Sequence, residues 1–118
     1  MLYMKDWEVC APPGFSLGFE GDNGATVLEV STDLTEEWDL KVDVEKDGGK
    51  NIIQLTRNGT VYSALLTASM LADDGTYAMQ VRGTLGDYVR HSNLFYATVF
   101  RSINAVDFFP PPLPSEFE

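Results

Sequence analysis

Residues 40–67 of this 118-residue chain, LKVDVEKDGGKNIIQLTRNGTVYSALLT, determine the fold class. Leu40, Val42 and Val44 alternate with charged residues, a period of two that predicts a half-buried antiparallel strand over 40–46. A glycine turn then leads into a returning strand over 51–57. The dipeptide Asn58-Gly59 predicts a hairpin with a type I′ turn, in which both residues take a positive φ, and 61–67 pairs back across it.

Further strands are predicted on both sides of this stretch. The same alternation and the same glycine-rich turns indicate strands over 15–19, 26–31, 76–82 and 88–101. One helical turn is expected at 33–36, where Asp33 is followed three residues later by Glu36, and another after 61–67. Seven or eight short strands, spaced about ten residues apart, are typical of a β-sandwich or barrel.

The run Asp73-Asp74-Gly75-Thr76-Tyr77 favours the sandwich. An Asp-x-Gly-x-Tyr pattern entering a strand is the tyrosine corner of Greek-key sandwiches, where the tyrosine hydroxyl bonds back to upstream backbone. Asp73, Gly75 and Tyr77 are therefore assigned a structural role. The prediction is an all-β, antiparallel Greek-key sandwich of seven or eight strands. Met79 stands where an inter-sheet cysteine would be expected.

Composition limits the possible functions. The chain fits one domain, and Cys10 is its only cysteine, so no intrachain disulfide can form and synthesis in a reducing cytoplasm is expected. A net charge of −10 disfavours nucleic acid and anionic membranes as partners. No apolar run approaches the length of a membrane span, and Lys5 and Asp6 interrupt the N-terminus where a signal peptide would be apolar.

No catalytic, cofactor-binding or metal-binding residues are predicted. His91 is the only histidine and has no recognisable acid or base partner in the sequence. The run Gly48-Gly49-Lys50 lacks the spacing and the Ser/Thr of a phosphate-binding loop. The acidic clusters at 36–39 and 73–74 lack the spacing of a calcium loop. The protein is therefore expected not to be an enzyme and to need no cofactor.

The C-terminal residues 107–118 differ from the rest, which sets the predicted sandwich domain at 1–106. Four prolines within 110–114 predict an extended, semi-rigid linker. Ser115 and Glu118 have the spacing of a capping box, so a helix is expected to begin here and to continue in a longer protein. The alternative is an acidic end without regular structure.

Several of these segments together resemble a known family. They are Asp73–Gly83 (DDGTYAMQVRG), His91-Ser92-Asn93 before an aromatic strand, and Pro110–Pro114 before Ser115-Glu116-Phe117-Glu118. From about Phe15 to Glu118 the chain resembles N-terminal modules of the baseplate upper protein and related tail-fibre proteins in phages and prophages of Gram-positive bacteria. The resemblance implies an immunoglobulin-like β-sandwich that attaches a fibre to the baseplate, followed by a Pro-rich linker and a helical, often trimeric stalk. Residues 1–13 have no counterpart and are expected to form an added strand or a docking arm.

The expected function is that of a non-enzymatic virion structural module, made in the bacterial cytoplasm and then held in the phage tail. Its expected partners are other virion subunits and, in the full-length protein, further copies of itself, for instance as a trimer. Five aromatic residues are candidates for these contacts: Tyr88, Phe95, Tyr96, Phe108 and Phe109. Phe108 and Phe109 could equally pack on their own domain.

The alternative function is a carbohydrate- or protein-binding sandwich that acts in adhesion to a host surface. It requires exposed aromatics on one face beside polar groups. Tyr88, Tyr96 and Trp38 are the candidates for stacking on sugar rings.

Overall fold

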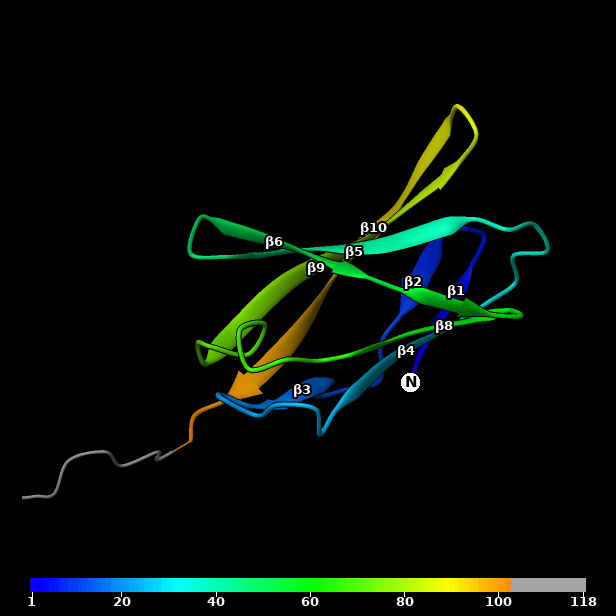
Figure 1. Ribbon diagram of the computed structural model, residues 1–118. Helices are drawn as coiled ribbons and strands as arrows, with labels where there is room; N and C mark the ends of the chain where they lie inside the picture. Colours follow the sequence, from blue (N-terminus) through cyan, green and yellow to red (C-terminus); the bar gives the residue numbers. More distant parts are fainter. Residues whose placement is uncertain (103–118) are drawn as a thin grey trace, which may run out of the picture.

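The computed structural model describes residues 1–102, which form ten β-strands in two five-stranded sheets (Figure 1). Sheet A has the strand order β2-β1-β4-β8-β7, and sheet B has the order β3-β10-β9-β5-β6. The strands of sheet A are β1 (Leu2–Lys5), β2 (Glu8–Cys10), β4 (Val27–Thr32), β7 (Thr56–Asn58) and β8 (Val61–Leu65). The strands of sheet B are β3 (Ser16–Phe19), β5 (Asp39–Lys46), β6 (Gly49–Gln54), β9 (Gly75–Leu85) and β10 (Tyr88–Phe100).

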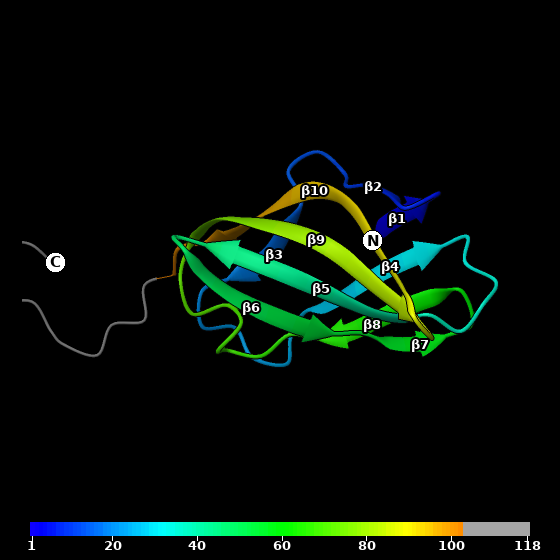
Figure 2. The same ribbon diagram turned by 90° about the horizontal axis from the view of Figure 1, so that it is seen from above.

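The two sheets pack against each other, as the view from above shows (Figure 2). The chain is therefore all-β, and the arrangement is compatible with the predicted β-sandwich. Two details of the prediction are wrong. The sheets are mixed, because β1 runs parallel to β4 and β3 runs parallel to β10. The strands number ten, because residues 1–13 contain a hairpin and the strand expected over 51–57 is two strands.

That predicted strand divides at Leu55, where the chain crosses from sheet B to sheet A. The Leu55 side chain is buried between the sheets, and its amide donates to the Leu40 carbonyl oxygen at 3.1 Å. The Gln54 amide group fixes the crossing by donating to Asp39 Oδ1, Leu40 O and Leu55 O. Strand propensity alone predicts a single strand over 51–57, because both halves of this segment are extended.

Two turns also differ from expectation. Asn58 pairs with Val61, and of the two expected residues only Gly59 has a positive φ, at 66°. The loop is therefore Gly59-Thr60, with glycine at the first central position as in a type II′ turn. No helical turn forms at 33–36, whereas after β8 the Met70 and Leu71 amides donate to the Thr67 and Ala68 carbonyl oxygens in two successive turns. The Asp33 carboxylate instead accepts a hydrogen bond from the Asp6 amide at 3.2 Å, a long-range contact that the capping pattern could not reveal.

The core lies between the sheets and is built from the alternate, inward-facing residues of each strand. Along β5, for example, Leu40, Val42 and Val44 are buried while the residues between them reach the surface. Tyr62 is almost fully buried, and its hydroxyl donates to the Trp38 carbonyl oxygen at 3.1 Å. The largest fully buried side chains are Tyr62, Leu2, Met4, Leu28, Leu40, Leu66, Leu71 and Met79.

Residues 1–13 contribute strands and do not form a free arm. The β1–β2 hairpin turns at Asp6-Trp7, which have φ of 50° and 63°. Positive φ is strained for a bulky residue, and packing of the indole ring offsets this cost. The Trp7 side chain is buried, its ring centroid lies 4.9 Å from that of Trp38, and the Arg90 guanidinium lies 5.3 Å above the ring. A β-carbon on Gly83 would lie 2.3 Å from the Trp7 ring, so glycine is required there.

Candidate interaction surface

A bulge in β10 sets which aromatic residues reach solvent. His91 pairs with Arg82 and Leu94 pairs with Gln80, so β10 contains one more residue than β9 in this interval. Ser92 occupies the bulge, where its hydroxyl accepts from the Val81 amide at 2.9 Å and donates to the Asn93 carbonyl at 2.8 Å. The extra residue reverses the alternation of side chains for the rest of the strand.

The neighbouring Asn93 joins the two sheets. Its side-chain oxygen accepts from the Val9 amide at 2.6 Å, and its Nδ2 donates to the Val9 carbonyl at 3.1 Å. The side-chain amide therefore satisfies both backbone groups of Val9 on β2, as a neighbouring strand would. This contact holds the edge of sheet A against β10 of sheet B and gives the bulge a fixed position.

The outer face of sheet B carries a row of exposed apolar side chains, which we call the β10 strip. Beyond the bulge, Leu94 and Tyr96 are 55% and 59% exposed, and Val89 before it is 56% exposed. At the far end, the rings of Phe19 and Phe100 lie 5.5 Å apart. The strip comprises Phe19, Val89, Leu94, Tyr96 and Phe100. Clustered exposed apolar residues on one face are typical of a contact surface.

The charges on this outer face balance each other. Three ion pairs cover it: Asp39–Lys41 at 2.8 Å, Asp43–Arg82 at 3.2 Å and Glu45–Lys50 at 3.9 Å. The Lys41 ammonium, donating to Asp39, lowers the pKa of that carboxyl below its ordinary value. Three acidic and three basic residues give no net charge, whereas the whole chain carries −10. Residues 1–102 hold 15 acidic and 8 basic residues, a net charge of −7, and this acidic excess therefore lies away from the face that carries the β10 strip.

The structure separates the aromatic residues predicted as contacts. Tyr88 is 73% exposed near the tip of the β9–β10 hairpin, which extends past the sheets (Figure 1), and Tyr96 lies in the β10 strip. Phe95 is wrong as a contact residue, because the bulge turns it into the core, where it is 4% exposed. Phe108 and Phe109 lie outside the described residues.

The tyrosine of the Asp73–Tyr77 motif bonds to the backbone upstream. The Tyr77 hydroxyl donates to the Asp73 carbonyl oxygen at 2.5 Å, so Asp73 takes part through its backbone. Gly75 has a φ of 120°, a conformation that other residues rarely adopt. The Lys46 ammonium lies 5.9 Å from the centre of the Tyr77 ring. Burial raises the pKa of the Tyr77 hydroxyl above its ordinary value of 10.0, as it does for Tyr62.

We expect Tyr77→Phe to lower the free energy of unfolding at neutral pH by about 1 kcal/mol, because the Asp73 carbonyl loses its donor. A raised pKa also means that the folded protein holds the phenolic proton more tightly than the unfolded chain. The contribution of this proton to stability is therefore constant well below the ordinary pKa of 10.0 and is lost as the pH rises above the unfolded pKa. Urea unfolding at several pH values should show a smaller alkaline loss for Tyr77→Phe than for the unchanged protein. An equal loss in both would contradict this role of Tyr77.

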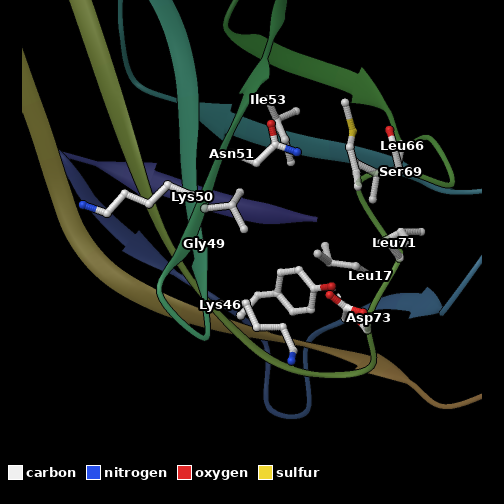
Figure 3. A pocket seen from close by; sticks show the side chains of 14 residues that line it. Leu17, Lys46, Gly49, Lys50, Asn51, Ile53, Leu66, Ser69, Leu71 and Asp73 are labelled. Atoms are coloured by element: carbon white, nitrogen blue, oxygen red, sulfur yellow. Dashed lines mark hydrogen bonds between the residues drawn. The ribbon is translucent and has the colours of Figure 1, made fainter.

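Three surface hollows accompany these features. The first, of about 180 Å³, lies between β6 and the loop after β8, and its floor includes Leu17, Leu66 and Leu71 (Figure 3). The second, of about 550 Å³, crosses the outer face of sheet B between Ile52 and Leu94. The third, of about 390 Å³, lies beside Trp7 and Trp38 and is mainly polar.

The three aromatics proposed for sugar stacking do not share a face. Tyr96 lies on the outer face of sheet B, and Tyr88 lies near the tip of the hairpin. Trp38 is half-buried against Trp7. They therefore do not form one stacking platform.

The remaining candidates for chemistry are dispersed. Within residues 1–102, no group of three or more His, Cys, Asp and Glu side chains is placed to hold a metal ion. His91 is exposed on β10, and Cys10 is exposed on the edge strand β2. No helix in the described part of the chain is long and apolar enough to cross a membrane.

Sequence reasoning missed the residues that organise this surface. The contacts of Trp7 and Asn93 span much of the chain, and no local pattern predicts them. The pairing of Phe19 with Phe100 depends on the parallel contact between β3 and β10. A signal for the bulge was present in the polar run from Arg90 to Asn93, which breaks the alternation of apolar residues along β10.

A scan of protein-family models finds no match to this chain, and a search of curated proteins finds no relative.

Proposed function

We propose that this protein is a non-enzymatic assembly module that binds another protein subunit through the β10 strip. The observation that carries the proposal is the combination of five large exposed side chains in one row with a face of zero net charge. An acidic partner, or one without charge, can approach this face without meeting the acidic groups of the rest of the molecule. Tyr96 and Phe100 supply rigid aromatic area of the kind that interfaces favour.

We further propose that the sandwich has an immunoglobulin-like, Greek-key topology. In support, the chain changes sheets after β2, β3, β4, β6 and β8, and from β4 onward this places β4, β7 and β8 in one sheet and β5, β6, β9 and β10 in the other. This alternation resembles the distribution of strands in immunoglobulin sandwiches. The tyrosine-to-backbone bond at Asp73 also supports it.

The biological setting that we propose is the tail or baseplate of a phage or prophage of a Gram-positive bacterium. This part of the proposal depends on the resemblance carried by Asp73–Gly83, His91-Ser92-Asn93 and the Pro-rich C-terminus. A contact face without a built catalytic site suits such a module. The full-length protein would place this domain at its N-terminus, beside other virion subunits.

Association with particles tests this setting. Phage particles would be induced from the bacterium that carries the gene and purified through a density gradient. Antibodies against this domain are expected to label the tail end of the particles in electron micrographs. Detection of the protein only in fractions without particles would contradict the proposal.

A further inference from the structure

Among the strands of residues 1–102, β6 is the longest edge strand of the two sheets. The other three edge strands, β2, β3 and β7, have three, four and three residues, whereas β6 has six. Short length is one way in which proteins protect sheet edges from unwanted pairing; proline and bulges are others. The β6 strand contains no proline, and its pairing with β5 has no register shift.

The hydrogen-bond pattern identifies the backbone groups that face outward from this edge. Lys46 pairs with Gly49 across a two-residue turn, and the Leu55 amide donates to the Leu40 carbonyl, so odd-numbered residues from 49 to 55 bond toward β5. The backbone groups of Lys50, Ile52 and Gln54 therefore point away from the sheet. The Ile52 amide is bonded to the Asn51 side-chain oxygen at 2.8 Å, a local contact that an incoming strand could replace.

The first hollow opens along the inner side of the same edge (Figure 3). Asn51 and Ile53 of β6 form one wall, and Ser69 and Leu71 of the loop after β8 face them. A strand added beside β6 would direct alternate side chains to this side of the sheet, and the residue opposite Asn51 would point into the hollow. A volume of about 180 Å³ with an apolar floor suits one large aliphatic or aromatic side chain.

The outer side of the edge favours different residues. Side chains of an added strand would there lie beside Lys50, Ile52 and Gln54. Ile52 is 51% exposed, and the Glu45 carboxylate is held only loosely by Lys50, at 3.9 Å. A basic side chain of the added strand can pair with this loosely held Glu45 carboxylate, so basic or neutral side chains are preferred at these positions over acidic ones.

We propose that β6 binds an extended segment of another protein as an added strand of sheet B. The segment places one large apolar side chain in the hollow between β6 and the loop after β8, and basic or neutral side chains on the outer face. A second copy of this chain is a poorer partner. If the β6 strand of a second copy were the added strand, its inward-facing side chains would be Asn51 and Ile53. Ile53 is already buried in the core of that copy and could not fill the hollow. This edge is separated from the β10 strip by β9 and β5, so the inference does not depend on the proposed function.

The test uses the whole chain and a short synthetic peptide in which lysine and threonine alternate. One central threonine of the peptide is replaced by leucine. Binding would be followed by NMR, together with hydrogen exchange of the backbone amides. We expect slowed exchange at Lys50, Ile52 and Gln54, and a dissociation constant that rises at least about tenfold when the peptide backbone is N-methylated or its leucine becomes aspartate.

Two protein variants test the contributions of the β6 edge and of the hollow to binding separately. Ile52→Pro removes an outward amide at an edge position that tolerates proline, and Ser69→Phe fills the hollow. Each should weaken binding by about tenfold or more, whereas Ser63→Phe on the outer face of sheet A should leave it unchanged. Absence of peptide binding, or binding without protection of the three amides, would overturn the proposal. So would a dimer in which β6 pairs with itself, since the partner would then be a second copy.

Discussion

Replacing Trp7 with alanine is expected to lower the free energy of unfolding by about 3–5 kcal/mol, the usual cost of removing a large buried aromatic. The ring is only 8% exposed, and it contacts Trp38, Arg90 and Gly83, which come from three other parts of the chain. Its loss also leaves the strained Asp6-Trp7 turn without the packing that offsets its cost. Urea unfolding followed by circular dichroism measures the change.

The matched substitution Gly83→Ala tests whether the Trp7 ring lies against Gly83. Alone, it should cost about 1–3 kcal/mol, because the new methyl group would lie 2.3 Å from the Trp7 ring and 2.9 Å from Leu40. In the Trp7→Ala background the same change should cost clearly less, since the ring is absent. Additive costs in the double variant would mean that Trp7 and Gly83 are not in contact.

Replacement by alanine is expected to cost much more stability at Phe95 than at the adjacent Tyr96. Phe95→Ala should cost about 3–5 kcal/mol, because Phe95 faces the core after the Ser92-Asn93 bulge. Tyr96→Ala should cost less than about 1 kcal/mol, because Tyr96 is 59% exposed on the outer face. The free energy of unfolding of each variant measures the difference directly.

Tyr3→Ala provides the control for this pair. Tyr3 is 60% exposed on β1 and has nearly the same exposure as Tyr96, but it lies on sheet A. Its replacement should change stability as little as that of Tyr96. A large cost for Tyr96→Ala together with a small one for Phe95→Ala would mean that the bulge lies elsewhere, and the β10 strip would then be wrongly assigned.

The fold class could be predicted from local patterns because the strands alternate so regularly. The stretch from Leu40 to Lys46 forms a strand as predicted, and its apolar residues face the core. Patterns of this kind report which residues are half-buried, but they do not report which strand lies beside which. The parallel contacts of β1 with β4 and of β3 with β10 join segments far apart in sequence, so they could not be predicted locally.

The candidate surface was predictable only in part. An aromatic strand over 88–101 was correctly identified, and Tyr88 and Tyr96 are indeed exposed. Phe95 was misassigned because one inserted residue reverses the alternation, and a count of apolar positions does not detect it. The charge balance of the outer face depends on three cross-strand and local ion pairs, which require the register of β5, β6 and β9.

Site-specific photocrosslinking, carried out in the particles that we propose as the setting of this protein, tests the central claim most directly, that the β10 strip is the contact surface. A photoreactive phenylalanine analogue would replace either Tyr96 or its equally exposed counterpart Tyr3, and crosslinked products would be identified by mass spectrometry. We expect a crosslink from position 96 to another protein subunit and none from position 3. A crosslink from position 3 alone would contradict the account, because the contact surface would then lie on sheet A.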